Sequence, residues 1–178
     1  MTSFHTTARR FQSIIYKENG FPFKGTIMPV DEGEVPSYDF SSPRLVLRTI
    51  TKDVVKARDV IIDKLNRRYI VASHGYSPWG DQFTFRLFQV LADLSWKRQT
   101  TVVNPLTGLP QGGVPVDLGL APCLVEMTGR QFPDRPSNLM EETRRILTSV
   151  ELQLGDHLDD AIVKRIDTSL GVTYAEIV

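Results

Sequence analysis

The residues able to do chemistry are few in this chain and far apart. The three histidines, His5, His74 and His157, have no spacing that would bring them to one metal ion, so we expect ordinary surface or hydrogen-bonded histidines. Cys123 lies in an apolar stretch with nothing beside it that would lower the pKa of its thiol, and we expect it to be a buried structural thiol. A single cysteine also excludes an intrachain disulfide and a cysteine-based metal site.

The charged clusters favour a solvated surface over a reaction centre. Asp156, Asp159 and Asp160 gather at an expected turn, where carboxylates could do acid–base work but are routine as solvated groups. Three basic pairs lie near expected strands and could face DNA or an acidic partner, although a solvated strand face is the simpler interpretation. These pairs are Arg67-Arg68, Lys97-Arg98 and Arg144-Arg145.

Motifs that bind phosphate or metal are absent from the sequence. Segment 104–113 (NPLTGLPQGG) is rich in glycine, but no Gly-Lys-Ser/Thr follows it. The acidic segment 31–43 (DEGEVPSYDFSSP) lacks the Asp-x-Asp-x-Asp-Gly pattern of calcium loops. No Gly-x-Ser-x-Gly nucleophile elbow occurs. We therefore predict no catalytic residue, no metal site and no cofactor, and a protein that is not an enzyme.

Composition indicates a folded chain that does not bind nucleic acid in general. The chain has 178 residues, enough for one domain with a real core, and 21 basic residues balance 21 acidic ones. It contains no apolar run long enough for a transmembrane helix, and no apolar signal region follows Arg9 and Arg10. We expect the protein to be made and kept in the cytosol, or assembled there. Eleven prolines and twelve glycines divide the chain into short segments, which favours a mostly β fold.

The strongest structural signal is a β-hairpin between Asp59 and His74. Two β-rich runs, 60–62 and 69–72, flank a polar gap that contains Asn66. A helix across 54–65 is the alternative, but three consecutive β-branched residues favour a strand.

The N-terminal segment predicts a helix. Phe4, Ala8, Phe11 and Ile15 recur at helical spacing, and Asn19-Gly20 is a fitting end, so we expect a helix over about 4–17. It would pack on its own sheet or be offered to a neighbouring subunit.

Alternation and turn residues predict the remaining strands, and no internal repeat is visible. Segment 82–91 could also form a helix through Leu87, Leu91 and Leu94, but we favour a strand that pairs with the strand at 94–103. A short helix could start at Ser137. The other expected extended segments are 21–30, 44–50, 121–127, 143–154, 161–166 and 172–178.

The predicted fold class is mainly β: an antiparallel β-barrel or sandwich of short strands with an N-terminal α-helix and long projecting loops. We expect a single domain over 1–178, with the helix in 1–20 and the β core in 21–178. The projecting loops are 31–43, 75–81 and 104–114. Exposed aromatic and apolar residues on such segments often mark contact surfaces, although Trp79 could equally cover the core. The candidate subunit-contact residues are Phe4, Phe11, Tyr38, Phe40, Tyr76, Trp79 and Leu109.

Three stretches together resemble small virion proteins of tailed bacteriophages that form the neck between capsid and tail. They are DVIIDKLNRRYIVASH, the middle stretch FRLFQVLADLSWKRQTTVVNPLTGLP and the C-terminal VELQLGDHLDDAIVKRIDTSLGVTYAEIV. The resemblance covers about 44–107 and 143–178, and it is one of pattern, with no invariant motif. The N-terminal segment and the acidic loop have no counterpart in it.

The resemblance implies a structural subunit of a head–tail connector, head-closure or tail-terminator ring. Such a subunit would form a homo-oligomeric ring and contact other neck, portal-adaptor or tail proteins, with DNA passing through the lumen and no membrane involved. It would be made in the host cytoplasm and end in the virion. The alternatives are a tail or baseplate subunit of the same virion and a ligand-binding β-barrel of the host.

Overall fold

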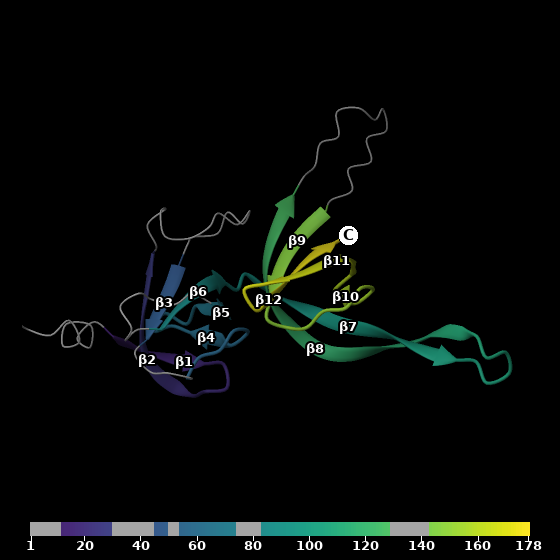
Figure 1. Cartoon of the computed structure of the whole chain (residues 1–178), viewed down its shortest axis with the longest axis horizontal. Helices are drawn as coiled ribbons and strands as arrows, with labels where there is room; N and C mark the ends of the chain where they lie inside the picture. Colours follow the sequence, from purple (N-terminus) through teal and green to yellow (C-terminus); the bar gives the residue numbers. More distant parts are fainter. Residues whose placement is uncertain (1–11, 30–44, 50–53, 74–82, 129–142) are drawn as a thin grey trace, which may run out of the picture. The chain divides into compact units, whose positions relative to one another are not determined.

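A computed structural model describes residues 12–29, 45–49, 54–73, 83–128 and 143–178 of the chain. Within these ranges the regular structure consists of twelve β-strands and no helix (Figure 1). No helix in this part of the chain is long and apolar enough to cross a membrane. The described residues form two compact units: unit 1 comprises those up to Val90 together with Leu170–Val172, and unit 2 comprises those within Leu91–Ser169 together with Thr173–Val178.

Unit 1 contains a closed antiparallel barrel with the strand order β1-β2-β3-β6-β5-β4. Its interior is filled by Ile15, Leu47, Ile61, Tyr69 and Leu87, all of them buried side chains. The strands are β1 (Ser13–Lys17), β2 (Pro22–Pro29), β3 (Leu45–Thr49), β4 (Val60–Ile62), β5 (Arg68–Ala72) and β6 (Phe83–Gln89).

Unit 2 contains a second closed barrel with the strand order β10-β11-β12-β9-β8-β7. Cys123, Ile146, Leu158, Val163 and Ile177 lie in its core. The strands are β7 (Ala92–Val103), β8 (Pro110–Thr128), β9 (Thr143–Thr148), β10 (His157–Leu158), β11 (Ala161–Ser169) and β12 (Val172–Ile177), of which all but the first residue of β12 lie in unit 2.

The two barrels have the same topology. If β7 to β12 are matched in chain order with β1 to β6, every neighbouring pair in one barrel has its counterpart in the other, including the closing pairs β1–β4 and β7–β10. The fold therefore repeats one barrel topology, although the sequence shows no repeat.

The turn before the fourth strand of each barrel confirms this correspondence. In unit 1, Asp59 follows Arg58, which has a φ of 74°, and in unit 2 Asp156 follows Gly155, which has a φ of 84°. The carboxylate of each aspartate accepts a hydrogen bond of 2.8 Å from the backbone N–H three residues earlier. The carbonyl oxygen of each aspartate also accepts a 2.9 Å bond from a valine in the fifth strand of its barrel. The same hydrogen-bonded turn thus precedes the fourth strand of both barrels.

The prediction of an N-terminal helix was wrong. Residues 13–17 form β1, which pairs with β2 and β4, and the rest of the expected helix, residues 1–11, lies outside the described residues. Ile15 is fully buried, whereas its neighbours Ile14 and Tyr16 are exposed. This period of two follows from the pleat of a barrel strand, and tertiary pairing overrides the helical spacing that Ile15 shares with Phe11.

The hairpin at Asp59–His74 is confirmed as β4 and β5, which pair in antiparallel fashion. Its turn is organised by Asp63, whose Oδ1 accepts bonds from the N–H groups of Leu65 and Arg67 and whose Oδ2 contacts the Arg67 guanidinium. Burial opposes ionisation of Asp63, but these bonds outweigh it and lower the pKa of its carboxyl. Tyr69 donates a further bond of 3.3 Å to Oδ2.

Other details differ from the prediction. Residues 83–89 and 92–103 are strands, but they do not pair, because β6 is the last strand of one barrel and β7 the first strand of the next. The strand expected over 143–154 ends at Thr148, and the loop expected over 104–114 ends at Leu109 because β8 starts at Pro110. The loops 31–43 and 75–81 lie outside the described residues. Folding as a single domain stays a prediction.

Candidate functional site

The feature that stands out is a long hairpin formed by β7 and β8. Within the barrel, β7 pairs with β10 at Trp96 and Lys97, and β8 pairs with β9 from Cys123 to Thr128. Beyond these positions the two strands pair only with each other in the described part of the chain. We call residues 99–116 the arm, which extends from its barrel as a two-stranded ribbon (Figure 1).

The barrel does not need the arm. The equivalent hairpin of unit 1, β1–β2, has a first strand of only five residues and turns back at once, with Gly20 N–H donating to the Lys17 carbonyl. That barrel is nevertheless closed. Since the same topology forms with a short hairpin, the arm is an addition that the fold itself does not explain.

The arm carries no charge and exposes apolar side chains on both faces. No Asp, Glu, Lys or Arg occurs from residue 99 to residue 116. Leu106 is 94% exposed and Val114 80% exposed. The other large exposed side chains of the arm are Val102, Val103, Leu109 and Val116. Adjacent strand residues point to opposite faces, so Val102 and Val103 make both faces apolar.

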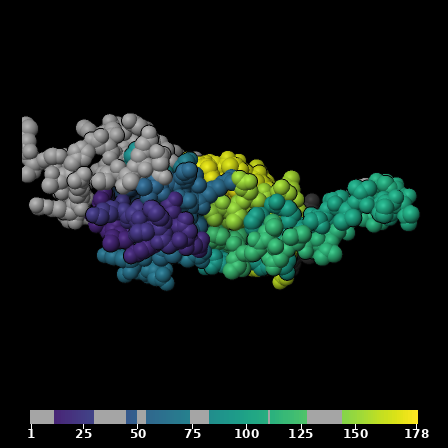
Figure 2. Space-filling model, turned by 90° about the horizontal axis from the view of Figure 1, so that it is seen from below, coloured from purple at the N-terminus to yellow at the C-terminus, as the bar shows by residue number. Residues whose placement is uncertain are grey.

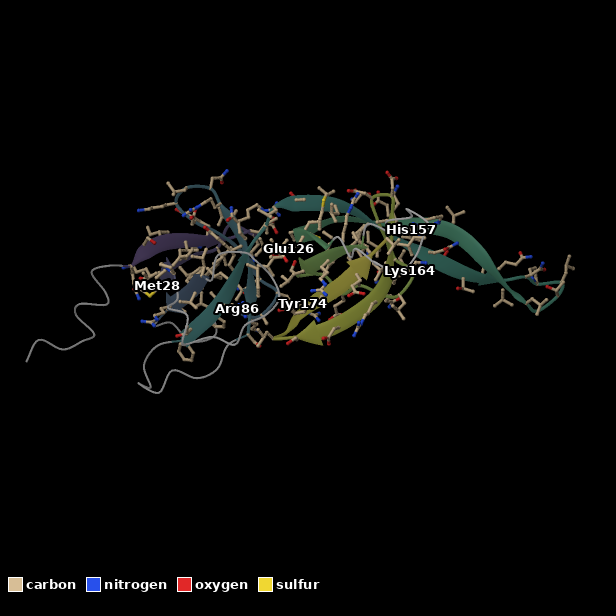
Figure 3. The ribbon with its side chains drawn as sticks, turned by 90° about the horizontal axis from the view of Figure 1, so that it is seen from above. Met28, Arg86, Glu126, His157, Lys164 and Tyr174 are labelled. Atoms are coloured by element: carbon tan, nitrogen blue, oxygen red, sulfur yellow. The ribbon has the colours of Figure 1, made fainter. Side chains whose placement is uncertain are left out.

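No part of the barrel covers these side chains. Figure 2 shows the arm, in teal, standing clear of the strands of its own barrel. In Figure 3 its side chains project to either side of the ribbon. Large exposed apolar patches are uncommon on monomeric proteins, and they typically mark protein contacts.

The tip of the arm is held by hydrogen bonds and displays its leucines in a defined arrangement. Asn104 Oδ1 accepts a 2.8 Å bond from Leu106 N–H, and the Asn104 carbonyl accepts one of 2.8 Å from Gly108 N–H. Asn104 N–H in turn donates to the Leu109 carbonyl at 2.9 Å. Gly108 has a φ of 67°, which suits glycine at this position. Leu106 and Leu109 are thus presented by a preorganised turn.

The shaft of the arm contains a close approach between its two strands. Thr100 Oγ1 donates a 3.0 Å bond to the Val114 carbonyl, and the register shifts between Gln99 and Thr101. A Cβ on Gly113 would lie 2.5 Å from Thr100 Oγ1, so only glycine fits there. The bulge increases the local twist of the ribbon.

The base of the arm is fixed by a buried carboxylate. Asp156, 1% exposed, accepts bonds of 2.9 Å from Arg98 Nε and Nη2 and of 3.0 Å from Trp96 Nε1. Arg98 also donates to the Glu151 carbonyl. Burial opposes ionisation of Asp156, but the bonds from Arg98, Trp96 and Gln153 prevail and lower its pKa. The strand that becomes the arm is thereby anchored where it leaves the barrel.

The acidic cluster expected at a solvated turn is therefore structural in part. Asp156 is buried, and Asp159 links the turn to β7 through bonds of 2.8 Å that its Oδ1 and N–H make with the backbone of Ser95. The structural role of Asp156 cannot be inferred from local sequence, because its partners Trp96 and Arg98 are 60 and 58 residues away along the chain. No cluster of three or more metal-binding side chains occurs among the described residues.

Each of the three basic pairs has at least one arginine engaged with a carboxylate. Arg67 contacts Asp63 at 2.7 Å, Arg98 binds Asp156, and Arg145 lies 3.9 Å from Glu176. Arg68 also bonds Glu18. Such pairing reduces the positive field that these groups could offer to phosphates.

Cys123 is fully buried, and its Sγ lies 3.3 Å from the Ala121 carbonyl oxygen. Burial raises the pKa of its thiol to about 12. The thiol stays protonated at neutral pH, which makes it a poor nucleophile.

Of the candidate contact residues, the structure places only Leu109, which is exposed at the end of the arm. The other six, Phe4, Phe11, Tyr38, Phe40, Tyr76 and Trp79, lie outside the described residues. Sequence reasoning identified the loop but missed the shaft of the arm. The available signal was the uncharged run of residues 99–116, which is unusual in a chain with 24% charged residues.

Comparison of the chain with protein-family models, with curated proteins and with solved structures finds no match.

Proposed function

We propose that this chain is a structural subunit that assembles by docking the β7–β8 arm on another protein. The observation that carries the proposal is an uncharged, apolar ribbon added to a barrel whose twin in the same chain closes without it. An isolated two-stranded ribbon is marginally stable in water, and a partner that covers its faces would stabilise it.

The arm has enough exposed apolar surface for specific association. The exposed fractions of its six large apolar side chains together equal about four whole side chains. At about 1.5–3 kcal/mol for each buried side chain, complete burial contributes roughly 6–12 kcal/mol before the entropy of association is subtracted. The preorganised tip reduces that entropic cost because its turn is already formed.

Within this class we propose a subunit of the neck of a tailed bacteriophage, such as a head-closure or connector ring. The support is the resemblance of the hairpin, middle and C-terminal stretches to such proteins, together with an all-β scaffold that projects an arm. The proposed partners are further copies of the chain and adjoining portal-adaptor or tail proteins, with DNA in the lumen. The proposed location is the virion, after synthesis in the host cytoplasm.

Deleting the arm tests the proposal. Arg98 and Val116 are directly opposite in register, so replacing residues 99–115 with Asn-Gly gives a two-residue hairpin turn that the Val116 N–H can close. The anchor between Arg98 and Asp156 stays intact. We expect the variant to lose assembly, measured by light scattering after size exclusion and by electron microscopy with purified neck components, while its melting temperature stays within a few degrees.

A matched control is Leu154→Lys, which changes an apolar side chain of unit 2 that is 69% exposed but lies outside the arm. This variant should assemble normally. An arm-deleted protein that assembles as well as the wild type would refute the proposal.

A further inference from the structure

The described part of unit 1 exposes four large apolar side chains, and three of them lie on one hairpin. Ile14, Tyr16 and Phe21 belong to β1–β2, whereas Leu65 lies at the β4–β5 turn. Ile14 and Tyr16 share the outer face of β1 because Ile15 between them points into the core. Pro22 lies opposite Tyr16 in register. We use the name β1–β2 face for Ile14, Tyr16 and Pro22 together with the exposed Phe21 in the adjoining turn before β2.

We propose that the arm of one copy docks on the β1–β2 face of a second copy of this chain. This inference rests on the proposed function, namely that the chain assembles through its arm, and it adds the identity of the surface on which the arm docks. Both surfaces are exposed in the single chain, and each is apolar.

The charges around the β1–β2 face suit an uncharged arm. Lys17 contacts Asp59 at 2.7 Å, and Glu18 is bonded to Arg68. Two charged side chains of the hairpin are thus already neutralised within the barrel, and docking an arm without charges leaves neither of them to be paired again. Lys24, opposite Ile14, is exposed and can extend its charge into water while its stem covers the contact.

The size of the arm fits an interface between subunits. From residue 99 to residue 116 the arm holds 18 residues, close to the roughly 20–30 that a standard interface takes from each partner. Its tip adds two exposed leucines, and the β1–β2 face offers aromatic side chains, which are enriched in interface cores.

The arm and the β1–β2 face are different surfaces on different units of one chain. Every copy then offers one arm and one β1–β2 face, so the contact is heterologous. Heterologous contacts between identical subunits propagate head to tail and close into a ring when the rotation permits.

Mixing two complementary variants of the full chain tests this arrangement. The arm-deleted protein keeps the β1–β2 face. The double variant Ile14→Lys/Phe21→Lys keeps the arm but loses the apolar character of the β1–β2 face. By mass photometry we expect the wild type to form oligomers and each variant alone to be a monomer. A mixture of the two variants should form a heterodimer and nothing larger. The Ile14→Lys/Phe21→Lys substitutions should raise the dissociation constant for self-association at least about 10-fold.

Leu65→Lys is the matched control, because Leu65 is 62% exposed in the same unit and Phe21 is 61% exposed. It should oligomerise as the wild type does. Thermal melting of every variant checks that the barrels remain folded.

Crosslinking provides a readout that does not depend on the lysine variants. A Leu106→Cys chain mixed with a Phe21→Cys chain of different tag should form a mixed disulfide under mild oxidation, whereas a Leu65→Cys chain should not. The native thiol does not interfere because Cys123 is buried.

Three outcomes overturn the inference in distinguishable ways. If the Ile14→Lys/Phe21→Lys variant alone forms wild-type oligomers, the arm docks elsewhere, for instance on another arm. If the wild type is a monomer that assembles only with a different protein, the arm docks on that protein and not on a second copy of this chain. Both results leave the proposed function standing, whereas unchanged assembly after arm deletion refutes the proposed function as well.

Discussion

Replacing Asp156 with asparagine should destabilise unit 2 more than the equivalent replacement of Asp59 destabilises unit 1. The two aspartates occupy corresponding turns of the two barrels, yet Asp156 is 1% exposed and binds Arg98 and Trp96, whereas the Asp59 side chain is 27% exposed and pairs with Lys17. In the Asp156→Asn variant the new side-chain amide would direct its N–H donors at Arg98 or Trp96, which are themselves donors.

The magnitude follows from these contacts. Removing one partner of a buried ion pair costs about 3–5 kcal/mol, and the partial exposure of Arg98 reduces this to roughly 2–4 kcal/mol for Asp156→Asn. Asp59→Asn removes a partly exposed pair and should cost about 0.5–1 kcal/mol. Urea unfolding followed by the fluorescence of Trp96, in a Trp79→Phe background, measures the free energy of unfolding of unit 2, and circular dichroism follows the Asp59 variant.

The effect of pH provides an independent check. The pKa of Asp156 is lower in the folded chain than in the unfolded chain, where it is about 3.9. Its stabilisation is therefore fully present above about pH 4 and is lost as the pH falls through the lower folded value. The gap between wild type and Asp156→Asn should shrink below about pH 4. A gap under about 1 kcal/mol at neutral pH, or a larger loss for Asp59→Asn, would refute this reasoning.

Two further predictions concern the arm and the core thiol. Gly113→Ala should weaken assembly and speed amide exchange in the arm while the melting temperature is kept, because its Cβ would meet the Thr100 carbonyl oxygen at 2.7 Å. Gly112→Ala is the control, since its Cβ would meet only the flexible Gln99 side chain at 3.1 Å, and equal effects of the two would contradict the steric argument. Cys123 should react with a thiol reagent at pH 8 at least roughly 100-fold more slowly in the native protein than in denaturant, because burial raises its pKa to about 12, and rapid native labelling would show that the site opens.

The strand at the N-terminus shows why a local pattern can mislead. Phe11 and Ile15 fit one stripe of a helix, but Ile14, Ile15 and Tyr16 also fit a strand with one buried position. Only the pairing of β1 with β2 and β4, which closes the barrel, decides between the two. Pairing partners far along the chain are not encoded in local spacing.

The sequence by itself determined the mostly β character, the β4–β5 hairpin and several strand positions, because these depend on local propensity and turn residues. Tertiary structure decided the rest. Residues 83–89 and 92–103 are adjacent in sequence but belong to different barrels, and the twin topology is invisible in the residues because many sequences fit one backbone. The burial of Asp156 and the exposure of the arm likewise depend on which strands surround them, and neighbours of that kind exist only once the chain has folded.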